Sequence, residues 1–567
     1  MKTTNKSGVA LFIEECYRNG MRNVVCSPGS RNAPLIIALD EHPEIETVVI
    51  HDERSAGFFA MGMAQRLKEP VGVVCTSGSA VLNYFPAVAE AFYQSIPLIV
   101  ISADRPNEWI NHGDGQTIMQ ENVFGKHVHA SVTIDEYVQD SSEKNYLIEK
   151  IDSAFSKANH QWKGPIHFNV PVSEPLYEMI EKDFSLPAKN NHSKSNDFHF
   201  SEEEGGFIEE KWSSCAKKMI LCGQMDKNGA IQSILDAFSN DSSVVVIVEN
   251  TSNLRGNRFV HCIDRTLTAI SDDLIEDFQP DLLITIGGAI VSKRIKTFLR
   301  ESTIKEHWNS GYSFPEMNTF RKLTKHFNCT SLAFLVELEK LNLKFHSSSF
   351  GNKWKQLDVV VNDKLQDYNR DLTLSDLKVV EVILDFIPEN SILHMGNSSI
   401  VRYCQLFDPI LSVDYYSNRG TSGIDGCSST AAGIAHVSVG KLNVLITGDV
   451  SFLYDSNALW NDYLSNNLCI IVVNNQGGGI FKIIDGPQRT NQLEKYFVAK
   501  HNYSAANIAD AFNIEYSKVN SLEELENEIP LFYQKSTTDR PKILEVFTSP
   551  ELNDVELKKY FEFIKRK

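Results

Sequence analysis

The feature that most constrains the fold is a pair of apolar runs, each followed closely by an oxygen-bearing side chain. Residues 442–446 precede Asp449, and residues 468–473 precede Asn475. Runs of this length and apolarity are typical of buried parallel strands. Parallel strands of an open α/β sheet end at the same edge, which is where such sheets bind ligands. We therefore expect the two side chains to lie close together at that edge.

The chemistry of these two positions suits a metal-bound diphosphate. Carboxylate, amide and carbonyl oxygens are ligands for a hard divalent cation such as Mg²⁺, and the glycines after Asn475 let a diphosphate approach the backbone. For either motif alone, an ordinary strand end with a turn aspartate is the alternative. The segment between the motifs is long enough for one helix, which we expect at residues 456–465.

Together the two motifs resemble the diphosphate–metal signature of thiamine diphosphate enzymes. The resemblance implies that Asp449, Asn475 and the carbonyl of Gly477 bind the metal, Mg²⁺ or Mn²⁺. It is not complete, because Val450 stands where the signature usually has glycine, and the sequence does not explain this departure. The further cofactor contacts that it implies are Ser77, Gly78, Asn397, Gly423, Gly448, Val450, Ser451 and Gly478.

Composition narrows the class of protein. The 567 residues suffice for three domains, and 42% hydrophobic with 23% charged residues is typical of a globular protein. The net charge of −18 argues against a nucleic-acid binder. Ten scattered cysteines without a Cys-x-x-Cys motif indicate reduced thiols, and neither a signal core nor an apolar run of membrane-spanning length is present. We expect a cytoplasmic protein that binds neither nucleic acid nor membrane.

Short apolar runs alternate with helical patterns along most of the chain, which predicts α/β domains with parallel sheets. Polar breaks at 189–206 and 346–352 divide this pattern. We therefore predict three domains, at residues 1–188, 207–345 and 353–567. The expected strands are 23–26, 47–50, 71–75, 98–102, 166–170, 219–222, 244–248, 282–286, 391–394, 444–446, 469–473 and 542–546.

Glu53 follows an expected strand and precedes an expected helix at 55–67. An acidic side chain in the first turn of a helix is common, so a cap is one interpretation. The resemblance implies instead that Glu53 hydrogen-bonds the cofactor pyrimidine and promotes proton loss from the thiazolium C2. That role needs a site that raises the pKa of the carboxyl. Ile424 is the candidate to support the bent cofactor, with a buried loop isoleucine as the alternative.

Cationic side chains recur near the ends of the expected strands. Arginine forks bind carboxylates in a bidentate manner, so several of them in one site indicate substrates with several carboxylates. A salt bridge is the alternative for each arginine alone, and a plain helix start is the alternative for Lys293 and Arg294. The motifs are Ser27-Pro28-Gly29-Ser30-Arg31-Asn32, Ala103-Asp104-Arg105-Pro106, Gly115-Gln116-Thr117-Ile118, Ser292-Lys293-Arg294, Asn397-Ser398-Ser399-Ile400-Val401-Arg402 and Asn418-Arg419-Gly420.

As a set, in this order along the chain, these motifs resemble the 2-succinyl-5-enolpyruvyl-6-hydroxy-3-cyclohexene-1-carboxylate synthase family of menaquinone biosynthesis. The resemblance implies a transferase that decarboxylates 2-oxoglutarate and adds the succinyl-semialdehyde carbanion to isochorismate in a 1,4-addition. It implies that Ser30, Arg31 and Gln116 act in catalysis with Glu53. The implied 2-oxoglutarate side is Ser398, Arg402 and Arg419; the isochorismate side is Arg31, Arg105, Gln116, Lys293 and Arg294; and the apolar wall is Ile480 and Phe481.

The resemblance also implies how the domains are used. Residues 1–188 would bind the pyrimidine, 207–345 would form the middle domain and 353–567 would bind the diphosphate. The active site would lie between subunits of a homodimer or a dimer of dimers.

Two other functions stay open at this point. One is a different thiamine diphosphate enzyme, either acetolactate-synthase-like or a simple 2-oxo acid decarboxylase, although small neutral substrates would not need these arginines. The other is a non-catalytic nucleotide-binding protein on the same fold, although no Gly-x-Gly-x-x-G motif follows a first strand.

Overall fold

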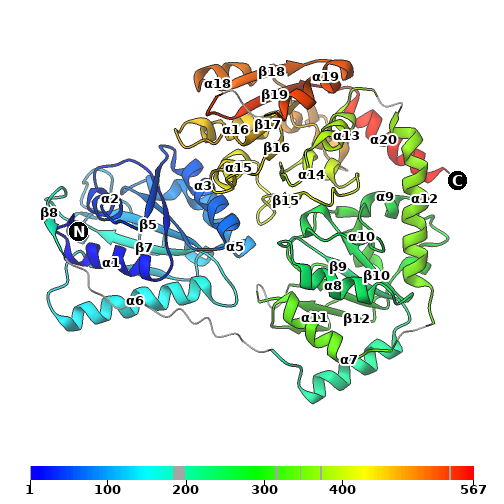
Figure 1. Cartoon of the computed structure of the whole chain (residues 1–567), viewed down its shortest axis with the longest axis horizontal. Helices are drawn as coiled ribbons and strands as arrows, with labels where there is room; N and C mark the ends of the chain where they lie inside the picture. The colour runs from blue at the N-terminus through cyan, green and yellow to red at the C-terminus, as the bar shows by residue number, and fades with distance from the viewer. Residues whose placement is uncertain are drawn as a thin grey trace.

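Three parallel sheets, each covered by helices, follow one another along the chain in the computed structural model (Figure 1). The α/β class with parallel sheets is thereby confirmed. The three domain boundaries stay predictions, and residues 188, 189–197, 345 and 346 at those boundaries lie outside the described part of the chain. The structure describes residues 2–182, 198–312, 317–344, 347–370, 373–484, 486–534 and 538–566.

The first unit contains a six-stranded sheet in the order β3-β2-β4-β5-β7-β6, with helices between successive strands. A two-stranded antiparallel ribbon, β1–β8, lies beside it. The strands are β1 Lys2–Thr4, β2 Asn23–Cys26, β3 Glu46–Val49, β4 Val71–Cys75, β5 Leu98–Asp104, β6 Ser131–Thr133, β7 Ile166–Pro171 and β8 Met179–Glu181. The helices are α1 Ser7–Arg18, α2 Ala33–Asp40, α3 Glu53–Leu67, α4 Ala80–Asn83, α5 Phe85–Gln94 and α6 Ser141–Asn159.

The middle unit contains a five-stranded sheet in the order β10-β9-β11-β12-β13. Its strands are β9 Lys218–Cys222, β10 Val244–Val248, β11 Leu282–Ile286, β12 Glu306–Ser310 and β13 Lys325–Phe327. Its helices are α7 Glu202–Ser214, α8 Gly229–Phe238, α9 Ile263–Thr268, α10 Lys293–Glu301 and α11 Ser331–Lys340. The long helix α12, Phe350–Arg370, joins two cores, because Trp354 packs in the middle unit and Leu365 packs in the third.

The third unit contains a six-stranded sheet in the order β15-β14-β16-β17-β19-β18. The strands are β14 Ile392–Met395, β15 Asp414–Tyr416, β16 Asn443–Gly448, β17 Leu468–Asn474, β18 Glu515–Val519 and β19 Lys542–Phe547. The helices are α13 Asp376–Phe386, α14 Ser399–Cys404, α15 Cys427–His436, α16 Asp449–Tyr454, α17 Ile480–Ile483, α18 Ala506–Ala511, α19 Leu522–Phe532 and α20 Asn553–Lys565. Short 3₁₀ turns are Asn107–Trp109, Gly125–His127, Asn250–Ser252, Ile275–Phe278, Ser456–Leu459 and Pro487–Arg489, and Leu493–Val498 is a π-helix.

Each of the expected strands is present to within two residues at either end. The expected helix at 456–465 is wrong. A helix begins earlier, at Asp449, and a 3₁₀ turn covers only Ser456–Leu459. Asn461 explains the break, since its side chain donates to Ala458 O at 2.9 Å and accepts from Tyr463 N at 2.9 Å. Such local bonds replace those of a helix.

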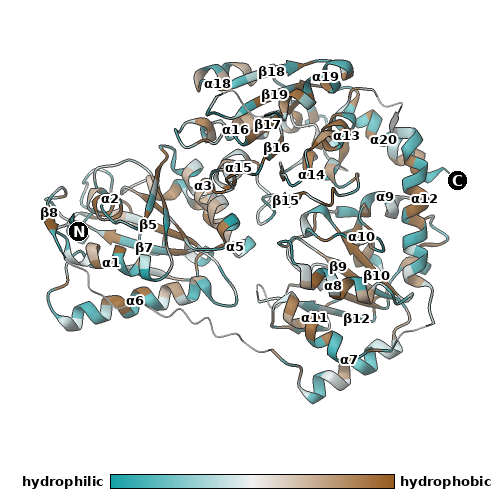
Figure 2. Ribbon diagram, in the orientation of Figure 1, coloured by the Kyte–Doolittle hydropathy of each residue, from teal (hydrophilic) through white to brown (hydrophobic). Residues whose placement is uncertain are grey.

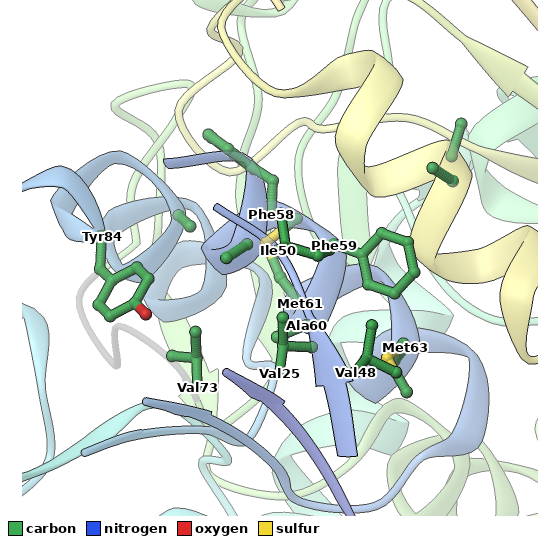
Figure 3. Packing of buried hydrophobic residues seen from close by; sticks show 14 of the residues in the cluster. Val25, Val48, Ile50, Phe58, Phe59, Ala60, Met61, Met63, Val73 and Tyr84 are labelled. Carbon is green, nitrogen blue, oxygen red and sulfur yellow. The ribbon is translucent and has the colours of Figure 1, made fainter. Parts of the chain in front are cut away.

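The first and third units share a hydrophobic core where α3 packs on α15. A Cβ on Gly62 would lie 2.4 Å from Thr430 O, and one on Gly433 would lie 2.1 Å from Phe59 O, so glycine is needed at both contacts. Phe58 and Phe59 of α3 and the sheet residue Val25 all belong to this core (Figure 3). Burying one such phenylalanine contributes about 1.5–3 kcal/mol.

Hydropathy follows the layers. Figure 2 shows hydrophobic strands inside the units and mixed surfaces on outer helices such as α6 and α12. All ten cysteines are buried and free. Over the described ranges, none of the helices combines the length and apolarity needed to cross a bilayer.

Candidate active site

A cavity of about 870 Å³ opens at the carboxyl edge of the third sheet, where β14, β16 and β17 end. Gly448 and Val473 are register partners on β16 and β17, which brings the residues after them together. The expected proximity of Asp449 and Asn475 is therefore observed. Lining residues that the sequence singled out are Asn397, Ser398, Ile424, Gly448, Asp449, Val450, Ser451, Asn475, Gly477, Gly478, Ile480 and Phe481.

Asp449 is a buried carboxylate, 3% exposed, at the start of α16. Its Oδ1 accepts from Val450 N at 2.7 Å and its Oδ2 accepts from Gly477 N at 3.0 Å. Burial raises the pKa of Asp449 to about 7 in spite of these hydrogen bonds. A cation bound beside the carboxylate would favour its charged form.

Asn475 presents a buried oxygen with no partner in the described part of the chain. Its Nδ2 donates to Asp376 Oδ2 at 2.7 Å, which orients the amide, while Oδ1 has no hydrogen-bond partner. A buried acceptor left unsatisfied costs about 1–3 kcal/mol. This free oxygen, the Asp449 carboxylate and a backbone carbonyl nearby fit a hard divalent cation.

The backbone around this pair leaves room for a ligand. A Cβ on Gly448 would meet no heavy atom within 4 Å, so the cavity reaches the main chain there. Gly477 has φ +149°, and a Cβ on it would lie 2.7 Å from Val498 O. Val450 lies in the first turn of α16, where right-handed helical backbone accommodates a side chain. The departure from the usual glycine is thereby explained.

Other residues of this cavity were not singled out from the sequence. Asp376 is fully buried and also accepts from Thr548 Oγ1 at 2.6 Å and Asn553 Nδ2 at 2.8 Å. His501 Nε2 lies 3.3 Å from Asp449 Oδ2, and its ring stacks on Tyr503. Asp376 follows Ser375 and reads as a first-turn acid, and no motif surrounds His501, so the sequence carries no signal for either.

Glu53 is the first residue of α3 and is half-buried. Asp52 is the cap, because its Oδ1 accepts from Arg54 N at 2.9 Å and from Ser55 N at 3.2 Å. Burial raises the pKa of Glu53, a backbone hydrogen bond lowers it and Asp52 raises it. The Glu53 carboxyl is thus free of the capping role and suited to sharing a proton.

The other candidates of the first unit follow the carboxyl ends of its strands. Gly78 has φ +86° and donates from its N–H to Gln120 Oε1 at 2.8 Å. A Cβ on Gly78 would lie 3.2 Å from the Cα of Gln116, so these two segments touch. Ser77 lies just before Gly78, and its hydroxyl is buried without a partner among the described residues.

Two arginines of the first unit are already held by protein groups. Arg31 donates to Val172 O at 3.0 Å and forms an ion pair with Glu174 at 3.1 Å. Arg105 lies 3.7 Å from Asp114. Ser30 and Gln116 are exposed. Each of these two arginines therefore has a carboxylate nearby, as the salt-bridge alternative expects.

Glu53 and the 870 Å³ cavity belong to different units of the chain. The lining of the 870 Å³ cavity runs from Asp376 to Tyr503 and belongs entirely to the third unit. Glu53 is not part of that lining, although it belongs to the same proposed chemistry. The structure thus brings the diphosphate-side residues together around this cavity. Glu53 is not among them, although the next residue, Arg54, donates to the O atom of Tyr454, which lines the cavity, at 2.9 Å.

A second cavity of about 600 Å³ holds three of the expected cations, Lys293, Arg294 and Arg402. It shares Ser399 and Ile480 with the 870 Å³ cavity, so the two adjoin. Burial lowers the pKa of Arg402, and so does neighbouring Arg419.

Lys293 and Arg294 lie at a helix start, as their alternative interpretation expects, and they also line the second cavity. Lys293 and Arg294 open α10, where the helix dipole disfavours positive charge. Arg294 lies over the Phe561 ring at 4.2 Å. The Arg402 guanidinium donates to Ser398 O, and Ser398 has φ +70°, a strained value for serine. Residues with strained backbone, such as Ser398, often occur at ligand sites.

Arg419 is 8% exposed and lines a third cavity of about 340 Å³ rather than the 870 Å³ cavity. Its Nη1 donates to Asn397 Oδ1 at 2.7 Å. Asn397 in turn donates to Gly423 O at 2.6 Å. Arg419 therefore reaches the cavity lining through Asn397.

The chain has three α/β units with parallel sheets. At the edge of one sheet, a buried carboxylate–amide pair lies beside glycine-rich backbone. These features define a thiamine diphosphate-dependent enzyme. Residues 6–126 match the family described as thiamine pyrophosphate enzyme, N-terminal TPP binding domain. The whole chain belongs to the 2-succinyl-5-enolpyruvyl-6-hydroxy-3-cyclohexene-1-carboxylate synthase family.

Three relatives of that name carry this assignment. The protein of Flavobacterium johnsoniae is 44% identical over 97% of this chain and 98% of its own length. That of Christiangramia forsetii is 43% identical over 97% of both chains. That of Porphyromonas gingivalis is 38% identical over 99% of this chain and 98% of its own.

Proposed function

We propose that the chain decarboxylates 2-oxoglutarate and adds the succinyl unit to isochorismate, with thiamine diphosphate as cofactor. The products are 2-succinyl-5-enolpyruvyl-6-hydroxy-3-cyclohexene-1-carboxylate and CO₂, and the pathway is menaquinone biosynthesis. The observation that carries the proposal is the group of cations beside the 870 Å³ cavity in a chain of net charge −18. The relatives named after this product support it.

The metal in this proposal is Mg²⁺ or Mn²⁺, held by Asp449, Asn475 and the carbonyl of Gly477. The unsatisfied Asn475 Oδ1 supports this ligand set. Bound thiamine diphosphate supplies a nucleophilic C2 carbon and takes up the electron pair left when CO₂ departs. Glu53 would share a proton with the pyrimidine ring, and Ile424 would support the bound cofactor. The remaining cofactor contacts are Ser77, Gly78, Asn397, Gly423, Gly448, Val450, Ser451 and Gly478.

The substrates are held by charge. Arg402 and Arg419, with Ser398, bind the distal carboxylate of 2-oxoglutarate, and bidentate pairing fixes its direction. Ile480 and Phe481 exclude water beside the reacting carbon. Correct placement of two reactants supplies much of the acceleration in such a reaction. Isochorismate is bound by Arg31, Arg105, Gln116, Lys293 and Arg294, with Ser30, Arg31 and Gln116 next to the reacting atoms.

We also propose that the complete site forms between two subunits, in a homodimer or a dimer of dimers. The supporting observation is that Asp449 lines the 870 Å³ cavity and Glu53 does not. The first unit of one subunit would then serve the third unit of its partner, with the boundaries 1–188, 207–345 and 353–567. Ten buried free thiols support a cytoplasmic location.

Subunit mixing tests the shared site. Glu53→Gln and Asp449→Asn chains should each be inactive alone. Mixed after dissociation, they should recover about a quarter of wild-type activity, because half of random dimers carry one intact site of two. A mixture as inactive as its parts would place each site within one chain.

Substrate profiling separates the proposal from an acetolactate-synthase-like activity. Pyruvate carries one carboxylate and would leave Arg402 and Arg419 without a partner. We expect isochorismate-dependent consumption of 2-oxoglutarate and negligible consumption of pyruvate. Preference for pyruvate would overturn the substrate assignment while leaving the cofactor assignment intact.

A further inference from the structure

Two buried glutamates outside the proposed catalytic set flank the cationic residues. Glu90 lies on α5 of the first unit and is 1% exposed, and Glu249 follows β10 of the middle unit and is 2% exposed. Each carboxylate accepts hydrogen bonds from two consecutive backbone N–H groups of a distant segment. Each of those segments carries arginine or lysine side chains that the proposed function assigns to a substrate.

Glu90 holds the chain directly after Arg419. Its Oε1 accepts from Gly420 N at 2.7 Å, and its Oε2 accepts from Thr421 N and Thr421 Oγ1, both at 2.6 Å. A Cβ on Gly420 would lie 2.6 Å from Glu90 O, so the two segments are in close backbone contact. Gln94 also donates to Glu90 Oε1, at 2.5 Å. The first unit therefore fixes the segment from which the Arg419 side chain extends.

Glu249 holds the chain directly before Lys293. Its two oxygens accept from Val291 N and Ser292 N, both at 2.7 Å. Ser292 caps α10 by accepting from Ile295 N at 3.1 Å. The orientation of the first turn of α10 thus depends on the Glu249 carboxylate.

Neither glutamate lines the 870 Å³ or the 600 Å³ cavity, so each acts through the segment it holds. Both carboxylates lie close enough to Arg419 to raise its pKa against the lowering effect of burial. Charge-assisted bonds to two adjacent N–H groups restrain a segment more strongly than a single neutral bond.

We propose that Glu90 and Glu249 are positioning residues, each of which orients one group of cationic side chains in the active site. Glu90 orients Arg419 toward 2-oxoglutarate, and Glu249 orients Lys293 and Arg294 toward isochorismate. The assignment of substrates to these groups rests on the proposed function. The site therefore draws its geometry from all three units.

Steady-state kinetics of Glu90→Gln and Glu249→Gln test the proposal. Glutamine keeps the shape but turns one acceptor oxygen into a donor that faces a backbone N–H. Glu90→Gln should raise KM for 2-oxoglutarate by about tenfold, the effect of losing one bond to a charged group, and change KM for isochorismate by less than about twofold. Glu249→Gln should raise KM for isochorismate more than KM for 2-oxoglutarate, which it also affects because the Glu249 charge acts on Arg419.

Asp281→Asn is the matched control. Asp281 Oδ2 also accepts from two consecutive N–H groups, Ala216 and Lys217, at 3.1 Å each. It precedes β11 at the amino edge of the middle sheet, opposite the carboxyl edge, so neither KM should change. If a glutamine variant fails to fold by circular dichroism, the aspartate variant at that position should show the same selectivity.

The outcomes distinguish a failure of the proposed function from a failure of the positioning role of Glu90 and Glu249. A wild-type enzyme that does not couple 2-oxoglutarate to isochorismate overturns the proposed function and this inference with it. An active wild-type enzyme whose glutamate variants raise both KM values equally, or lower only kcat, overturns the inference alone. The crossed selectivity of the two variants supports it, since a general loss of stability would not choose between substrates.

Discussion

Replacing Gly448 by alanine should weaken the binding of the cofactor without lowering the stability of the fold. Gly448 has φ −82° and ψ 158°, which any residue adopts, and a Cβ there would meet no heavy atom within 4 Å. The folded protein therefore tolerates the methyl group. Its stability should stay the same or rise by about 0.4–1 kcal/mol, because alanine restricts the unfolded chain.

The same methyl group would occupy the cavity beside Asp449, where the proposed function places the diphosphate. Losing one hydrogen bond to a charged group costs about 1.5–3 kcal/mol. The Kd for thiamine diphosphate should then rise by roughly tenfold to a hundredfold. Isothermal titration calorimetry with excess Mg²⁺ measures this change, and differential scanning calorimetry measures the stability.

Gly229→Ala is the control, because a Cβ on Gly229 also meets open space, at the start of α8 in the middle unit. It should leave Kd unchanged. An equal Kd for Gly448→Ala and wild type would refute the placement of the diphosphate. Loss of the folded state in Gly448→Ala would refute the reasoning from open space.

Three further substitutions test single groups. Glu53→Gln should lower kcat by at least about a hundredfold, the contribution of a positioned acid–base group, while Kd for thiamine diphosphate changes little; wild-type turnover would contradict its role. Asn475→Leu removes the unsatisfied oxygen, so Mg²⁺ should no longer strengthen cofactor binding in calorimetry; an unchanged Mg²⁺ effect would exclude Asn475 as a ligand. Burial raises the pKa of Asp104 from 3.8 to about 6, so its stabilising contribution is present below pH 4 and is lost as the pH rises through 6. Urea unfolding should show wild type losing about 2 kcal/mol relative to Asp104→Asn between pH 4 and pH 7, and parallel pH profiles would contradict that shift.

The central strands could be predicted because their apolar runs are unambiguous. Residues 244–248 are a continuous apolar run, and 282–286 are interrupted only by Thr285; the structure places strands at both. Strands such as β12 and β18 were missed, because sequences like Glu-His-Trp-Asn-Ser are partly polar and short. The helix expected at 456–465 failed because Asn461 forms local hydrogen bonds instead.

The meeting of Asp449 and Asn475 could also be predicted, since adjacent parallel strands carry both to one edge. The hydrogen-bond partners that lie far apart in the sequence could not be predicted. Asp376 contacts Asn475 from far along the chain, and Glu90 contacts Gly420 from another unit. In a single sequence each reads as an ordinary helix acid, and only the folded chain shows what it holds.

The most direct test of the central claim is the coupling of the two substrates. The purified protein is incubated with thiamine diphosphate, Mg²⁺ and 2-oxoglutarate labelled with ¹³C at C1, with and without isochorismate, and labelled CO₂ is measured against isochorismate. Labelled CO₂ equal in amount to the isochorismate consumed, with little release in its absence, is the predicted result. The absence of isochorismate-dependent CO₂ release would contradict the assigned reaction.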